Sequence, residues 1–191
     1  MLELLRKKKG ENFYTAPPEG EADVFVKETV PFESLPDAAS DTMDEGRPAD
    51  EAHAFIVRGP MGLSTYVVLK TWNAEDGAPS RHAYAVDVVD GKRVGDTSYN
   101  VFGNELASTH MGTTAQGFER RGLGERRIII LNDIVEEAWG RTLPSASNVS
   151  ASGGGEGLWK KLVKRKLATA TSVYGSTRYE FIPTDERIET V

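Results

Sequence analysis

Apolar and polar residues alternate through the first half of the chain, a pattern typical of β-strands. Three stretches are rich in β-branched and aromatic residues and are separated by Gly, Pro, Asn and Asp: residues 53–59 (HAFIVRG), 64–72 (STYVVLKTW) and 81–89 (RHAYAVDVV). Asp90 and Gly91 lie between two apolar runs, and an Asp-Gly pair in that position is a strong signal for a β-hairpin. These features predict an antiparallel meander that continues to about residue 116.

The last strands of this meander have weaker patterns, and another weak pattern lies before it. Residues 94–103 (VGDTSYNVFG) and 105–114 (ELASTHMGTT) predict two more strands, with Gly103-Asn104 as the turn between them. Residues 22–32 (ADVFVKETVPF) also alternate, and we interpret them as a tether or an edge strand.

The spacing of apolar residues becomes helical after residue 116. Leu123, Ile130, Ile134 and the residues around them form a broad apolar face that ends at Trp139, before Gly140. We expect one helix of about four turns to pack on the sheet. Farther along, the pattern predicts a short extended piece at 141–147, a Ser- and Gly-rich loop, a second helix at 157–167, and a closing strand pair at 171–175 and 177–183. This order of elements predicts an α+β domain with a mixed, mainly antiparallel sheet flanked by helices.

The first fifty or so residues differ in composition from the rest. Residues 33–53 contain seven acidic residues and one arginine, together with two prolines and almost no large apolar residues. Such a segment buries too little apolar surface to offset the entropy lost on ordering, so we expect a mobile or partner-ordered linker. The basic stretch 4–9 (LLRKKK) is interpreted as a solvated terminus, a helix tip or a docking arm. We therefore divide the chain into an extended N-terminal arm with an acidic linker, 1–53, and an α+β domain, 54–191.

Composition excludes several classes of function. With 191 residues, of which 39% are hydrophobic, the chain is long enough for one core. The net charge of -6 argues against a protein whose whole surface binds nucleic acid or an anionic membrane. The absence of cysteine excludes disulfides, thiolate metal sites and a cysteine nucleophile, and the three histidines are too far apart in sequence to suggest a metal site. Because the sequence shows neither a secretory signal nor an apolar stretch long enough to span a membrane, we expect a cytoplasmic protein.

One motif carries candidate chemistry. Residues 117–127 (GFERRGLGERR) place two glycines, separated by a single residue, among four arginines and directly before an apolar run. A glycine turn that opens a helix exposes free backbone N–H groups, and the helix dipole favours negative charge there, so the motif fits a phosphate. An ordinary glycine-bearing helix start is the alternative. The motif is not a Walker loop, because no Gly-Lys-Ser/Thr follows it, and the antiparallel strands before it argue against a dinucleotide fingerprint.

Residues 119–141 (ERRGLGERRIIILNDIVEEAWGR) resemble the acetyl-CoA-binding motif of the GNAT superfamily of N-acyltransferases, in which Gln/Arg-x-x-Gly-x-Gly/Ala opens a long helix. The order of elements from about residue 54 to 183 is similar to the order in that family. Residues 143–162 (LPSASNVSASGGGEGLWKKL) also resemble a variant found among bacterial and phage-encoded members, in which a Ser-rich stretch leads to a Leu-Trp pair.

The resemblance implies a way of binding acetyl-CoA or another acyl-CoA. Its pyrophosphate would bind the backbone of the loop residues Arg120, Arg121, Gly122, Leu123, Gly124 and Glu125. The pantetheine would lie between the fourth and fifth strands, here 107–113 and 141–147, and a backbone N–H at or near Met111 would polarise the acyl carbonyl. Ser147 is expected to hydrogen-bond the pantetheine or to cap a helix, and Trp159 is expected at the cofactor. Glu119 departs from the family pattern, because it places a negative charge beside the pyrophosphate.

In the same family an amine attacks the thioester directly, which calls for a base and an acid. Candidate bases are Glu105 and His110 on the predicted fourth strand and Asp87 on an earlier strand, and each has a structural role as its alternative. Trp159 matches the position of the tyrosine that often serves as the general acid in that family. An indole N–H does not supply a proton to the departing thiolate as a phenol does. Tyr174 and Tyr179 are candidate replacements, with a place in the core as the alternative.

Two functions follow from these patterns. The first is an acyl-CoA-dependent N-acyltransferase whose amine acceptor the sequence does not identify. The second is a non-catalytic structural or assembly protein, for example a virion component, in which the N-terminal arm docks a protein partner. The glycine loop favours the first function, whereas Glu119, Trp159 and the long N-terminal segment favour the second. The cations of residues 160–166 (KKLVKRK) are interpreted as a solvated face, and contact with the CoA 3′-phosphate or with another acidic partner is the alternative. Nucleic acid is not favoured as a partner, because aromatic residues are not interleaved with these cations.

Overall fold

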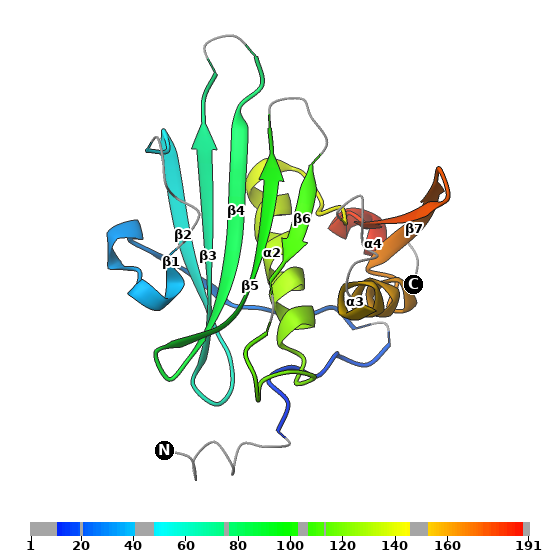
Figure 1. The fold of residues 1–191 in the computed structure, drawn as a ribbon, viewed down its shortest axis with the longest axis horizontal. Helices are drawn as coiled ribbons and strands as arrows, with labels where there is room; N and C mark the ends of the chain where they lie inside the picture. The colour runs from blue at the N-terminus through cyan, green and yellow to red at the C-terminus, as the bar shows by residue number, and fades with distance from the viewer. Residues whose placement is uncertain are drawn as a thin grey trace.

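The computed structural model describes residues 11–19, 21–40, 48–74, 77–102, 107–112, 114–145 and 153–188. It is an α+β structure with a six-stranded antiparallel sheet whose strands follow one another in sequence order (Figure 1). The strands are β1 (Lys27–Val30), β2 (Glu51–Arg58), β3 (Leu63–Trp72), β4 (Ser80–Val89), β5 (Lys92–Val101) and β6 (Ser108–Met111). The strands predicted at 53–59, 64–72 and 81–89 are confirmed as β2, β3 and β4.

The helix predicted after the glycine motif is confirmed as α2 (Leu123–Trp139), which packs on β3, β4 and β5. Its apolar face contributes Ile128, Leu131 and Val135 to a core shared with the sheet. It ends where the pattern predicts, because Gly140 adopts a left-handed φ of 62° and donates its N–H to the Glu136 carbonyl at 2.8 Å. The Asp90-Gly91 hairpin is also confirmed, with φ angles of 51° and 75° between β4 and β5.

The C-terminal part contains α3 (Gly153–Lys164), β7 (Ala168–Val173), β8 (Ser176–Phe181) and the short helix α4 (Thr184–Ile188). The predicted second helix and closing strand pair are therefore confirmed, and β7 and β8 form a sheet of their own. Residues 143–145 extend this second sheet, because the Ser145 N–H donates to the Tyr179 carbonyl and the Phe181 N–H to the Leu143 carbonyl.

The prediction of a mixed sheet was wrong. Every strand pairing in the described residues is antiparallel. Residues 143–145 pair with β8 and not with β6, so the six-stranded sheet ends at β6. The alternation of side chains predicts a strand but holds no information on which neighbour it pairs with.

The described residues of the segment 1–53 lie along the body of the molecule. Phe13 is 2% exposed and packs in a small apolar cluster with Leu63, Val94 and Leu123. Residues 27–30 form the edge strand β1, and single 3₁₀ turns at Phe32–Ser34 and Asp37–Ala39 follow it. The predicted boundary between residues 53 and 54 lies inside β2, and residues 1–10 and 41–47 lie outside the described residues.

Candidate functional site

The glycine motif forms the start of α2. Gly122 adopts a left-handed φ of 82° and directly precedes the first helical residue, Leu123. A helix leaves the N–H groups of its first turn without intrahelical partners and carries partial positive charge at that end. Arg120, which also has a left-handed backbone, is exposed beside this end. The local geometry is that of a glycine-opened helix start, and both the phosphate prediction and its alternative are compatible with it.

Arg121 is the arginine of the motif that is both buried and incompletely bonded. Its side chain is 9% exposed, lies 4.3 Å over the Phe13 ring and donates from Nε to the Glu11 carbonyl at 2.8 Å. Its Nη2 is buried and has no hydrogen-bond partner among the described residues. A buried charged donor without an acceptor is energetically costly, so an anion at this position would satisfy it.

The next two arginines serve the core and not the surface. Arg127 Nη1 lies 2.6 Å from Asp87 Oδ2, and both side chains are almost completely buried. Arg126 donates to Thr65 Oγ1 and to the carbonyls of Val57 and Arg58, and burial lowers the pKa of its guanidinium. These contacts attach α2 to β2, β3 and β4. Neither Arg126 nor Arg127 is therefore directed to the helix start, where the sequence predicts a phosphate.

The acidic residues of the motif are likewise engaged. Glu119 accepts the N–H of Gly117 at 2.7 Å, within its own turn. Glu125 is buried in the first turn of α2 and accepts from Arg165 at 2.9 Å and from Lys161 at 3.1 Å. The charge of Glu125 is therefore compensated by α3 and the residues after it.

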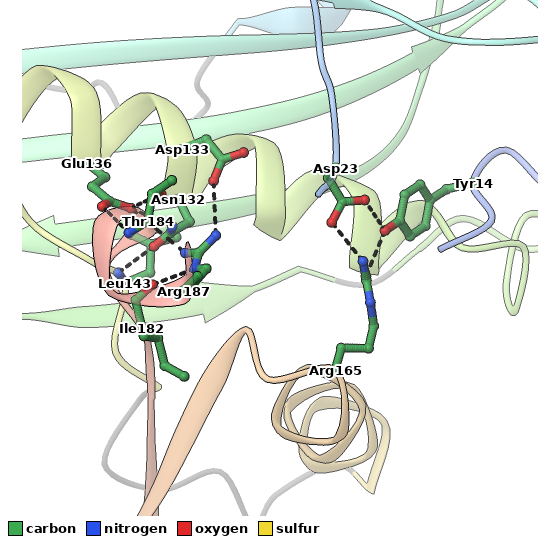
Figure 2. Close-up of polar contacts among 10 residues, drawn as sticks. All are labelled: Tyr14, Asp23, Asn132, Asp133, Glu136, Leu143, Arg165, Ile182, Thr184 and Arg187. Atoms are coloured by element: carbon green, nitrogen blue, oxygen red, sulfur yellow. Dashed lines mark hydrogen bonds and ion pairs between the residues drawn. The ribbon is translucent and has the colours of Figure 1, made fainter. Parts of the chain in front are cut away.

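A partly buried polar cluster joins α2, the end of α3 and the N-terminal segment, and Figure 2 shows three of its members, Tyr14, Asp23 and Arg165. Arg165 donates to Tyr14 Oη at 2.7 Å and to Asp23 Oδ2 at 2.7 Å, in addition to Glu125. Tyr14 donates its hydroxyl to Asp23 Oδ1 at 2.5 Å. Burial, reinforced by the hydrogen bond to Asp23, raises the pKa of Tyr14. The phenol is therefore a neutral donor within this cluster.

A broad groove of about 2020 Å³ opens beside this cluster. Its lining includes Tyr99 on β5 and Ala107 directly before β6, Pro144 and Glu180 from the second sheet, and Ile129 on α2. The groove thus lies where the two sheets part over α2, and residues 16–19 and 21–23 form part of its lining.

A second polar cluster lines the groove where α2 meets α4 (Figure 2). Glu136 accepts the N–H of Thr184 at 2.6 Å, and Arg187 lies 3.8 Å from both Glu136 and Asp133. Burial raises the pKa of Asp133 to about 6, although the positive charge of Arg187 opposes this shift. The Asp133 carboxylate therefore changes its charge close to neutral pH.

The predicted catalytic residues are dispersed. His110 is exposed on β6, opposite Ser98 in the register, and Met111 contacts the core cluster that contains α2. Tyr174 is fully exposed in the turn between β7 and β8, on the other sheet. Trp159 is 2% exposed, with its ring stacked 5.9 Å from that of Tyr179. Asp87 is bonded to Arg127, and Glu105 and Ser147 lie outside the described residues.

Sequence reasoning missed the two polar clusters. Asp23 and Arg165 are separated by 142 positions, and Asp133 on α2 and Arg187 on α4 by 54 positions. Arg165 belongs to a run of cations that the sequence analysis described as a whole, and no local pattern marks it as the one that turns inward. Only the packing of α3 and α4 against α2 brings these partners together.

Comparison of the sequence with known protein families and with curated proteins identifies no relative. The sequence matches no protein-family model, and no curated protein is similar to it. Within the ranges that the structure describes, no three His, Asp or Glu side chains form a group that could hold a metal ion. None of the helices in those ranges is both long and apolar enough to cross a membrane.

Proposed function

We propose that the protein is an acyl-CoA-dependent N-acyltransferase, which transfers an acetyl or another acyl group to an amine. The observation that carries this proposal is the start of α2, where the buried Nη2 of Arg121 has no hydrogen-bond partner among the described residues and lies beside the first-turn N–H groups, which lack intrahelical partners. Arg121, exposed Arg120 and the backbone of Leu123, Gly124 and Glu125 would hold the CoA pyrophosphate. The parting of the two sheets supports the proposal, because it leaves room for the pantetheine.

The proposed reaction is attack of the amine nitrogen on the thioester carbon, with cleavage of the carbon–sulfur bond and departure of the CoA thiolate. His110 is the described candidate for the base that takes the amine proton. Trp159 lies among aromatic rings and Tyr174 on the other sheet, so neither is placed beside His110 as an acid. We propose that water supplies the proton that the thiolate takes up.

A non-catalytic assembly protein is the second candidate, and two observations favour it. A Cβ at Gly122 would lie 2.5 Å from the Tyr14 carbonyl oxygen, so the N-terminal segment covers part of the loop. Two of the four arginines of the motif are also bonded in the core. A protein of this kind would use the groove or the N-terminal segment to bind a protein partner and would not transfer an acyl group.

Calorimetric titration with acetyl-CoA tests the proposal, and Gly124 provides a matched pair of variants. Gly124 is helical, and a Cβ there would meet its nearest atom, on Leu158, at 3.9 Å, so side chains fit. Gly124→Glu would place a carboxylate at the pyrophosphate site and should weaken binding roughly tenfold. Gly124→Ala adds no charge and should bind like the wild type.

Binding that is equal in the two Gly124 variants would contradict a pyrophosphate at the start of α2. If neither the wild type nor an Asp23→Asn variant binds acetyl-CoA at concentrations on the order of millimolar, the transferase proposal is wrong. Binding without acetyl transfer to any of a panel of amines would favour the non-catalytic candidate. Loss of transfer, with binding retained, in His110→Ala would support His110 as the base.

A further inference from the structure

The N-terminal strap, which we define as residues 11–19 and 21–23, lies directly on the start of α2. The Phe13 N–H donates to the Arg121 carbonyl at 2.9 Å, and the Glu11 carbonyl accepts from Arg121 Nε. The Phe13 side chain is buried beside Leu123, the first residue of α2. The strap thus holds both the backbone and the side chain of Arg121, the residue proposed to meet the phosphate.

At Gly122 the strap touches the loop itself. A Cβ on Gly122 would lie 2.5 Å from the Tyr14 carbonyl oxygen and 3.1 Å from the Tyr14 Cβ. A carbonyl oxygen carries partial negative charge, so at this position it stands where an anion bound to the loop would approach. An anion bound to the loop from this side would compete with this part of the strap for the same space and for the same positive charge.

The far end of the strap is fastened by Arg165. Its guanidinium binds Asp23 and Tyr14, both in the strap (Figure 2), and also Glu125 in the first turn of α2. The Asp23 side chain is 5% exposed and the Glu125 side chain 8%. Charged hydrogen bonds shielded from water in this way are stronger than surface pairs, so they form an effective fastening. Figure 1 shows the chain continuing from here across to β1.

We propose that the strap is a displaceable cover of the acyl-CoA site, fastened by Arg165, and that strap closure and acyl-CoA binding exclude each other. The inference rests on the proposed function. A ligand that binds only the open form has an apparent affinity reduced by the fraction of molecules that are open. Loosening the strap therefore raises the affinity, and binding of the ligand in turn opens the strap.

Asp23→Asn tests the fastening, because it removes one charge and keeps the shape of the side chain. We expect it to tighten acetyl-CoA binding by roughly ten- to a hundredfold, the range expected for loss of a hydrogen bond between charged groups. Tyr14→Phe, which removes only the hydroxyl, is a second variant with a smaller expected gain. Glu28→Gln is the control, because Glu28 lies in β1 and forms an exposed ion pair with Arg58 of β2, so its loss should leave the affinity unchanged.

Hydrogen exchange of the Phe13 amide measures directly whether the strap is closed or open. Acetyl-CoA should accelerate its exchange in the wild type, because the bond to the Arg121 carbonyl opens, while amides in the middle of β4 stay protected. If acetyl-CoA binds while Phe13 keeps its protection, or if Asp23→Asn and Tyr14→Phe bind no more tightly than the wild type, the strap is not a cover and the proposed function still stands. If neither the wild type nor Asp23→Asn binds, the proposed function falls, and the inference falls with it.

Discussion

Gly122 and Gly124 stand two positions apart in one motif, but the structure gives them different tasks. Gly122 has a left-handed backbone and lies against the Tyr14 carbonyl, so both its conformation and its surroundings require glycine. Gly124 is helical and has free space where a Cβ would be. The sequence marks both as loop glycines, and only the backbone angles and neighbours distinguish them.

Alanine at these two positions should therefore have opposite effects on stability. Gly122→Ala should lower the free energy of unfolding by about 1–3 kcal/mol, because a left-handed alanine is strained and its Cβ collides with Tyr14. Gly124→Ala should raise it by up to about 1 kcal/mol, because alanine favours the helix. Urea unfolding of both variants checks the pair, and a loss of stability in Gly124→Ala as large as that in Gly122→Ala would contradict this assignment.

At the scale of elements, α2 is attached to the sheet by a buried ion pair as well as by apolar packing. Arg127 pairs with Asp87 on β4 and also donates from Nε to Thr97 Oγ1 on β5. A Cβ at Gly95 would lie 2.5 Å from Arg127 Nη1, so β5 has a glycine where the guanidinium passes. The pair fixes the position of α2, and with it the position of the glycine motif.

Breaking this pair from one side should be more damaging than removing it. Asp87→Asn should destabilise the fold by about 3–5 kcal/mol, because it leaves the Arg127 charge buried without its partner. Asp87→Asn combined with Arg127→Met should recover much of that loss, because no uncompensated charge remains. Chemical unfolding of the two single variants and the double variant gives the coupling energy. Additive losses would show that the pair does not act as a unit.

The elements themselves were predictable to a large extent, whereas the use of the arginines was not. Hydrophobic period and turn residues located β2 to β5, α2 and the Asp90-Gly91 hairpin, because these signals are local. They did not show that Arg126 and Arg127 point into the core, since a positive residue on an apolar face has the same pattern whether it binds a ligand or a buried carboxylate.

At the scale of the whole molecule, the groove depends on segments that are distant in sequence. The N-terminal strap, α2, the end of α3, β8 and α4 all contribute to its lining. Arg165 connects the first three of these, and Glu136 with Arg187 connects α2 to α4. A change in one cluster is therefore expected to alter how the N- and C-terminal segments close around the groove.

Asp133 makes the stability of this assembly depend on pH. Its pKa is about 6 in the folded protein and 3.8 when unperturbed, so between these values the folded state binds more protons than the unfolded state. The stability contributed by the protonated carboxyl is complete below about pH 4 and is lost as the pH rises through 6.

Asp133→Asn, which cannot ionise, should therefore gain stability over the wild type, and the gain should be larger at about pH 8 than at about pH 5. Urea unfolding of both proteins at the two pH values measures this difference, and other titrating groups cancel in the comparison. In the variant Arg187 keeps Glu136 as a partner, so the substitution does not leave its charge unpaired. A gain in stability that is the same at both pH values would show that Asp133 does not titrate in this range.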